Sequence, residues 1–310
     1  MSTEPIGAVL DVSRVPGGRT GSLSVLSDYW ELTKPEINFL IAITTAAAFW
    51  IGTAAPLPQF PWTPFLESIL GTALLASGAA TLNQLIELPY DARMRRTARR
   101  PIASGRIAPV HALWFGVGLS VIGVAHLAVS TNALASVLAA LTLLSYLFLY
   151  TPLKRMTPLC ILVGAIPGAA PPLIGWAAAR GRLDPAAWGL FAIVFLWQFP
   201  HFMSIAWMYR DDYARAGFRV LPAGETNTNR FVMWQTLAAA AMLLVVSLSP
   251  PLTRLSGAAY VGGAFALGAI FLTSSARFAV RRTNLAARQL LLVSVLYLPA
   301  IFALLVFDAK

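Results

Sequence analysis

Charged side chains are scarce in this 310-residue chain. Only 12% of the residues are Asp, Glu, Lys or Arg, whereas 57% are hydrophobic, and the mean hydropathy is +0.69. A soluble domain of average composition carries about 25% charged residues. This shortage excludes an ordinary water-soluble globule and predicts that most of the chain lies in lipid.

Cysteine and histidine are also rare. Cys160 is the only cysteine, which excludes an intramolecular disulfide and a cluster of thiolate metal ligands. His111 and His126 lie in one apolar run without polar neighbours in the sequence, so packing or an interface contact is their expected role. Residues 1–34 lack the apolar core of a signal peptide, and we expect them to form a mobile cytoplasmic tail.

Long apolar runs dominate the rest of the chain. A helix needs about 17 to 25 residues to cross a hydrocarbon core of about 30 Å. Nine stretches meet this requirement, at residues 37–55, 66–89, 109–130, 132–150, 158–179, 185–208, 231–250, 258–275 and 288–308. The sequence therefore predicts an all-α polytopic membrane protein, with one transmembrane domain over residues 35–310.

The basic residues outnumber the acidic ones, 23 to 13. On a soluble surface this balance would suggest a nucleic-acid partner, but here the basic residues gather in short gaps between apolar runs, which is typical of membrane topology. If the N-terminus is cytoplasmic, the outside segments hold only Arg180, Arg182, Arg254 and Lys310. The positive-inside rule therefore predicts a cytoplasmic N-terminus and no nucleic-acid partner.

The second apolar run ends in a stripe of polar residues. Asn83, Glu87 and Asp91 are spaced four residues apart, which puts them on one face of a helix. An acidic group at membrane depth costs about 3 kcal/mol unless it faces protein or a wet cavity, so we expect this face to point inward. Carboxylate and amide oxygens suit Mg²⁺ that also binds phosphate. Pro89 is expected to kink or end the helix near Asp91.

A basic segment, residues 93–100, follows the stripe and contains five arginines. Guanidinium groups bind phosphate oxygens through paired hydrogen bonds. The stripe and the basic segment together predict a diphosphate site bridged by metal. The alternative is that the arginines only fix the topology and pair with the acids.

A second polar stretch runs from residue 197 to residue 217. Asp211 and Asp212 are candidates for a second Mg²⁺, with Arg215 on the phosphate; adjacent residues diverge by about 100° on a helix, so only one of the two is expected to bind directly. His201 lies in the sixth apolar run beside other polar groups and is a candidate substrate contact.

Two segments lie between these stretches. Lys154 and Arg155 form a short inside loop that adds cations to the same face. The Gly- and Pro-rich segment 164–176 predicts a broken helix, which membranes tolerate where it packs against protein or lines a cavity.

These motifs resemble a known family. The similar segments are 83–101, 150–155, 171–176, 197–202 and 212–217. The acid stripe resembles that of the UbiA-type intramembrane prenyltransferases as a whole. The sequences WQFPH at 197–201 and DYARAG at 212–217 resemble its haem-modifying branch, the protohaem IX farnesyltransferases (haem O synthases). The resemblance covers about residues 28–305.

The resemblance implies nine helices around a central cavity that is open to lipid. It implies transfer of the farnesyl group of farnesyl diphosphate to a vinyl group of haem B, giving haem O, with Mg²⁺ as cofactor. The implied location is a bacterial-type cytoplasmic (inner) membrane with the active-site loops on the cytoplasmic side. Haem O acceptor enzymes or oxidase assembly proteins are the implied partners.

The resemblance also assigns roles to the candidate site residues. The expected metal ligands, which are also the catalytic set, are Asn83, Glu87, Asp91 and Asp212, with Asp211 as the alternative to Asp212. The expected diphosphate ligands are Arg96, Arg100, Lys154 and Arg215. The expected haem contacts are His201 and Trp197.

Two other functions stay open. A quinone-precursor prenyltransferase would use the same metal site with an aromatic acid as acceptor. A secondary transporter also has polar groups in broken helices, but it would place its binding acids near the middle of the membrane. The stripe at 83–91 runs out to the inside face instead.

Overall fold

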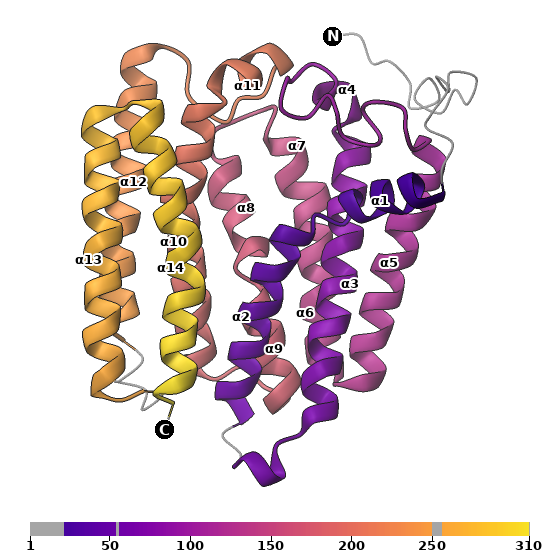
Figure 1. The fold of residues 1–310 in the computed structure, drawn as a ribbon, viewed down its shortest axis with the longest axis vertical. Coiled ribbons are helices and arrows are strands. Elements are labelled where there is room, and N and C mark those ends of the chain that lie inside the picture. Colours follow the sequence, from indigo (N-terminus) through magenta and orange to yellow (C-terminus); the bar gives the residue numbers. More distant parts are fainter. Residues whose placement is uncertain (1–21, 54–55, 250–255, 310) are drawn as a thin grey trace.

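The computed structural model describes residues 22–53, 56–249 and 256–309. The long elements in these ranges are α-helices that run up and down in one bundle (Figure 1). Nine spans of the described residues are long and apolar enough to cross a membrane: Pro35–Thr53 (α2), Trp62–Ile86 (α3), Pro109–Ser130 (α5), Ala133–Leu153 (α6 to α7), Cys160–Arg180 (α8 and α9), Pro185–Met208 (α10), Glu225–Ser247 (α12), Ala258–Arg281 (α13) and Asn284–Phe307 (α14). The predicted number of spans is confirmed, and their boundaries differ from the predicted ones by up to six residues.

Three short helices lie at one end of the bundle (Figure 1). They are α1 (Ser22–Leu32), α4 (Leu88–Asp91) and α11 (Arg210–Ala216). The prediction of a mobile tail through residue 34 is wrong for the residues from Ser22 onward, because they form α1; residues 1–21 lie outside the described residues.

Helix α1 lies across the end of the bundle (Figure 1). Polar contacts hold it there. Arg106 pairs with Asp28 at 2.8 Å and with Glu31 at 2.9 Å. The side chain of Gln84 on α3 donates a hydrogen bond to the carbonyl of Leu32 at 3.0 Å. These contacts explain why a segment of mixed composition is ordered.

Two of the nine spans are interrupted beside the centre of the bundle. The fifth span consists of α8 (Cys160–Gly168) and α9 (Pro171–Arg180), so the predicted broken helix is confirmed. In the fourth span, a π-helical turn at Ser145–Tyr150 separates α6 (Ala133–Leu144) from α7 (Thr151–Leu153). No pattern in the sequence predicted this turn, and such turns are frequent at functional sites.

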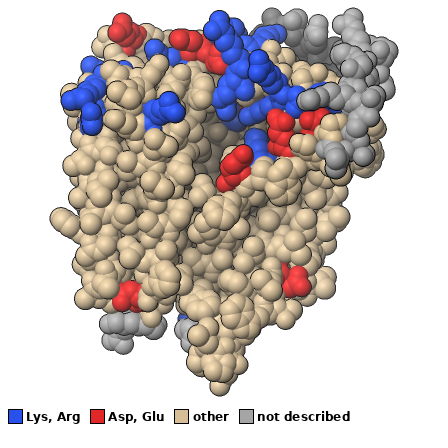
Figure 2. All heavy atoms as spheres, viewed as in Figure 1, with Lys and Arg blue, Asp and Glu red and all other residues tan. Residues whose placement is uncertain are grey.

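The charged side chains are distributed unevenly over the surface. Figure 2 shows Lys and Arg gathered at the end of the bundle that carries α1, α4 and α11, around a hollow on this face. Away from that end, His126 has a polar neighbour that its surroundings in the sequence do not show: its Nε2 lies 2.5 Å from a carboxylate oxygen of Glu67. His126 sits near the end of α5 and Glu67 near the start of α3.

Helices α3 and α5 approach each other closely through small residues. A Cβ added to Gly123 would meet the backbone nitrogen of Leu75 at 2.6 Å, so only glycine allows this approach. Close backbone packing matters in a membrane. Helices that are already surrounded by lipid gain no hydrophobic stabilisation from contact with each other, so van der Waals packing has to hold them together.

The first prediction follows from this contact. Gly123→Ala should force the two helices apart and lower the stability by about 1–3 kcal/mol, as overpacking does. Gly118→Ala on the same helix is the matched control, because an added Cβ would meet nothing within 4 Å. Thermal unfolding in detergent should show a loss for the first variant only; equal melting temperatures would contradict the close approach.

Candidate active site

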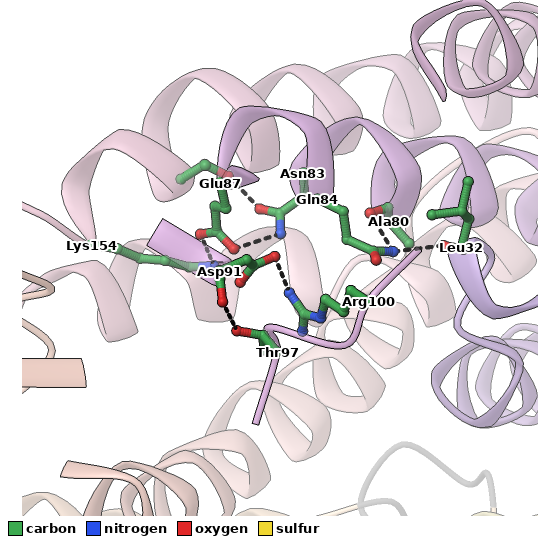
Figure 3. A network of polar contacts seen from close by, with 10 residues as sticks. Leu32, Ala80, Asn83, Gln84, Glu87, Asp91, Thr97, Arg100 and Lys154 are labelled. Atoms are coloured by element: carbon green, nitrogen blue, oxygen red, sulfur yellow. Dashed lines mark hydrogen bonds and ion pairs between the residues drawn. The ribbon is translucent and has the colours of Figure 1, made fainter. Parts of the chain in front are cut away.

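The polar stripe at the end of α3 keeps its predicted spacing although the helix breaks. Helix α3 ends at Ile86, and α4 begins at Leu88 with Pro89 in its first turn, so the predicted interruption near Pro89 is confirmed. The backbone N–H of Glu87 still donates to the carbonyl of Asn83 at 2.9 Å, and that of Asp91 donates to the carbonyl of Glu87 at 2.8 Å. The three side chains are buried and cluster together (Figure 3).

Glu87 is the centre of a buried network. One carboxylate oxygen accepts a hydrogen bond from Lys154 Nζ at 2.7 Å, and the other accepts from Asn83 Nδ2 at 2.9 Å (Figure 3). The hydroxyl of Thr151 donates to Asn83 Oδ1 at 2.9 Å. This network therefore joins the end of α3 to α7.

The charges of this network stabilise each other. Burial by itself would raise the pKa of Glu87, but the charge and the hydrogen bond of Lys154 hold that pKa below its ordinary value. Burial opposes the charge of Lys154 as well, yet the Glu87 carboxylate raises the pKa of Lys154 well above its ordinary value. Both groups are therefore charged at neutral pH.

Asp91 is held by the basic segment that follows it. Arg100 Nη1 donates to Asp91 Oδ2 at 2.6 Å, and the hydroxyl of Thr97 donates to the Asp91 carbonyl at 2.9 Å (Figure 3). Burial raises the pKa of Asp91, and the charge of Arg100 offsets part of this shift. Asp91 Oδ1 is buried and has no hydrogen-bond partner in the part of the chain that the structure describes.

The second polar stretch meets the first through Asp212. Its two carboxylate oxygens accept hydrogen bonds from the backbone N–H of Arg96 at 3.2 Å and from the side chain of Arg215 at 2.9 Å. Asp212 is buried, whereas Asp211 and Arg215 are exposed. A further bond, from the Arg219 N–H to the carbonyl of Lys154 at 2.7 Å, fixes the segment after α11.

A polar cavity of about 660 Å³ lies between these elements. Six predicted site residues line it: Asn83, Glu87, Asp91, Arg96, Arg100 and Lys154. Asp211, Asp212 and Arg215 are not among its lining residues, although Asp212 holds the Arg96 backbone at its edge. Metal or phosphate binding by these three residues stays a prediction.

A second cavity of about 280 Å³ adjoins the first and is mostly apolar. His201 and Trp197 line this cavity and not the polar one. The Trp197 indole donates to the carbonyl of Ser294 on α14 at 2.7 Å, and its ring stacks on that of His201 at 4.7 Å. His201 Nδ1 lies 2.8 Å from the hydroxyl of Ser294. Both side chains are therefore fixed against α14, and a haem contact stays a prediction for them.

Lys34 is a site residue that the sequence analysis missed. It lines both cavities, at the join between α1 and α2. Its φ of 49° lies in the left-handed region, which costs about 1–2 kcal/mol for a residue with a Cβ. Burial, with repulsion from Arg100, lowers the pKa of Lys34 to about 7. No local sequence pattern distinguishes it from a lysine that only fixes the topology.

The oxygen donors at this site suit an Mg²⁺ ion that is also bound by a substrate phosphate. They suit a metal held by protein ligands alone less well. No group of three or more His, Cys, Asp or Glu side chains in the described ranges could hold a metal ion. Mg²⁺ usually keeps several waters and takes one or two carboxylates together with phosphate oxygens. The buried, unpartnered Asp91 Oδ1 is one such donor, and the Asp91 side chain lies beside those of Asn83 and Glu87 (Figure 3).

Comparison with known proteins decides the family. The model of the UbiA prenyltransferase family matches residues 41–304. This chain belongs to the UbiA prenyltransferase family. It is therefore an integral, multi-pass membrane enzyme that transfers prenyl groups.

Relatives within the UbiA family are similar along nearly their whole length. Protohaem IX farnesyltransferase from Solibacter usitatus is 48% identical over 293 residues, which cover 91% of this chain and 99% of the relative. The protein of the same name from Koribacter versatilis is 44% identical, with 94% and 96% covered. The structure of a UbiA homologue from Archaeoglobus fulgidus bound to GPP and Mg²⁺ has a TM-score of 0.60 at 15% identity, covering 90% of this chain and 99% of that one.

The second prediction concerns the buried Glu87–Lys154 pair. Lys154→Met should lower the stability by about 3–5 kcal/mol, because it leaves the Glu87 carboxylate buried without its cation. The double variant Glu87→Gln/Lys154→Met removes both charges and should recover most of that loss, without recovering activity. Thermal unfolding in detergent measures both effects, and equal melting of the single and double variants would show that the pair is not coupled.

Proposed function

We propose that this protein transfers the farnesyl group of farnesyl diphosphate to a vinyl group of haem B and so makes haem O. The observation that carries the proposal is the polar cavity of acids and cations that continues into an apolar cavity. A prenyl diphosphate has the same division, with a charged head and a hydrocarbon chain. The choice of haem as acceptor is supported by the name of the relatives that are 44–48% identical to this chain.

The polar cavity is the proposed site of the diphosphate. Asn83, Glu87 and Asp91 would hold Mg²⁺, and Asp212 a second one. Arg96, Arg100, Lys154 and Arg215 would hold phosphate oxygens. When bound, Mg²⁺ neutralises the negative charge that grows on the departing diphosphate. The guanidinium and ammonium groups contribute to the same stabilisation from fixed positions around the cavity.

The reaction divides into bond breaking, bond formation and hydration. The allylic C–O bond breaks and its electron pair leaves with the diphosphate. The farnesyl cation is stabilised by aromatic faces, for which Phe202, Trp197 and Tyr213 are proposed; all three line the cavities. A haem vinyl carbon then bonds to the farnesyl carbon. Water adds to the resulting cation and loses a proton, which gives the hydroxyl group.

We further propose that the basic end of the bundle faces the cytoplasm of a bacterial-type inner membrane. Lys and Arg gather at this end (Figure 2), as the positive-inside rule requires of a cytoplasmic face. Farnesyl diphosphate, which is charged, would then reach the polar cavity from the cytoplasm.

Product analysis tests this function. The protein in detergent or membranes is supplied with farnesyl diphosphate and Mg²⁺, and with either haem B or 4-hydroxybenzoate as acceptor. We expect mass spectrometry to find farnesylated, hydroxylated haem and no prenylated benzoate. The opposite product would indicate a quinone-precursor enzyme, and substrate flux without diphosphate release would indicate a transporter.

The third prediction concerns the metal site. Asp91→Asn should lower the transfer rate by about 100-fold or more, since it removes a carboxylate that would hold the Mg²⁺ ion. Asp184→Asn is the control, because Asp184 pairs with Arg182 in the segment between α9 and α10. Wild-type turnover of the Asp91 variant, or full activity of the native protein without Mg²⁺, would refute the assignment.

The fourth prediction distinguishes between two candidate ligands of the apolar cavity, the haem edge and the farnesyl chain. If a haem edge reaches His201, His201→Ala should raise the apparent KM for haem while the KM for farnesyl diphosphate stays unchanged. If the farnesyl chain fills the cavity alone, the same variant should change only the KM for farnesyl diphosphate. The absorption spectrum of bound haem adds a second reading, because loss of an iron ligand shifts it.

A further inference from the structure

Lys34 is the one charged residue among those that line both cavities. The two cavities share Lys34, Ile37, Tyr146, Tyr150 and Phe202. A prenyl diphosphate whose head lies in the polar cavity and whose chain lies in the apolar one must cross from one to the other at these residues. In that arrangement, the C–O bond that joins head to chain would lie beside Lys34.

We infer that Lys34 is a catalytic residue whose ammonium group donates a hydrogen bond to the oxygen that leaves with the diphosphate. The inference rests on the proposed function, because it needs a prenyl diphosphate as substrate. When the C–O bond breaks, its electron pair moves to that oxygen. A donor aimed at this atom binds the transition state more strongly than the substrate, and so accelerates the bond-breaking step.

Two cations in the wall of the polar cavity, Lys34 and Arg96, have no carboxylate partner among the described residues, and of these two only Lys34 also lines the apolar cavity. Lys154 is paired with Glu87, and Arg100 is paired with Asp91. In the part of the chain that the structure describes, no carboxylate lies within ion-pair distance of Lys34, which is half-buried in the wall of the cavity. A half-buried cation without a carboxylate is costly, and a bound anion would offset that cost.

The backbone at Lys34 is kept in a conformation that glycine would adopt more easily. The φ of Lys34 is 49°, and Pro35 follows at the start of α2. The side chain of Asn38 donates to the carbonyl of Thr33 at 2.7 Å, which fixes the turn. Strained residues of this kind are enriched at functional sites, where the surrounding structure holds them in place. Here the strained turn presents a lysine to the junction of the two cavities.

The chain contains a matched control for the strain itself. Arg282 has the same φ of 49°, at the end of α13, and is exposed and lines neither cavity. Glycine at either position removes the same kind of strain. A difference between the two glycine variants therefore reports the side chain and not the backbone.

The experiment compares Lys34→Met, Lys34→Arg, Lys34→Gly and Arg282→Gly in the full-length protein. The readouts are the transfer rate at saturating farnesyl diphosphate, the binding of unreactive farnesyl thiodiphosphate, and thermal unfolding. We expect Lys34→Met to lower the rate by about 100-fold or more and to weaken analogue binding by no more than about tenfold. Lys34→Arg should recover part of the rate, and both glycine variants should be as stable as wild type or more so.

Two results would overturn the inference. One is an unchanged maximal rate in Lys34→Met, with or without a higher KM, because the lysine would then bind substrate only. The other is a loss of stability in Lys34→Gly but not in Arg282→Gly, with activity lost in proportion, because the lysine would then support the fold.

Failure of the proposed function gives a different result. If the wild-type protein prenylates 4-hydroxybenzoate and not haem, the choice of acceptor is wrong. The four variants can then be measured with that acceptor, since the C–O bond of farnesyl diphosphate breaks in both reactions.

Discussion

The site depends on the buried ion pair between Glu87 and Lys154. Neither charge would be stable alone at this depth, and together they join the end of the second span to the end of the fourth. The backbone carbonyl of Lys154 extends the connection by accepting the Arg219 N–H. One pair of charges thus sets the positions of three segments that are far apart in the sequence.

The two polar motifs become one site through contacts that use backbone as well as side chains. Asp212 accepts from the Arg96 N–H, and Arg100 donates to Asp91, so the basic segment lies between the two acidic motifs. The same arginines that the positive-inside rule explains as topology residues therefore also fix the geometry of the cavity. Topology and chemistry are not competing interpretations for this segment.

The breaks in the helices explain how a polar cavity can exist inside an apolar bundle. The π turn at Ser145–Tyr150 places Tyr146 and Tyr150 at the walls of both cavities, and the gap between α8 and α9 places Pro171 at the wall of the apolar one. Irregular backbone at membrane depth is tolerated where it lines a cavity or is buried in protein. A charged head and a hydrocarbon chain can therefore be bound side by side.

The sequence by itself determined the nine spans, the broken fifth helix and the stripe of Asn83, Glu87 and Asp91, because hydropathy, proline and a four-residue spacing act locally. Only the tertiary structure decided the contacts made across the bundle. It ordered α1, separated His201 from the polar cavity and brought Lys34 to the junction. These results depend on packing between helices distant in sequence, and no local pattern encodes that Lys34 lies in the walls of two cavities.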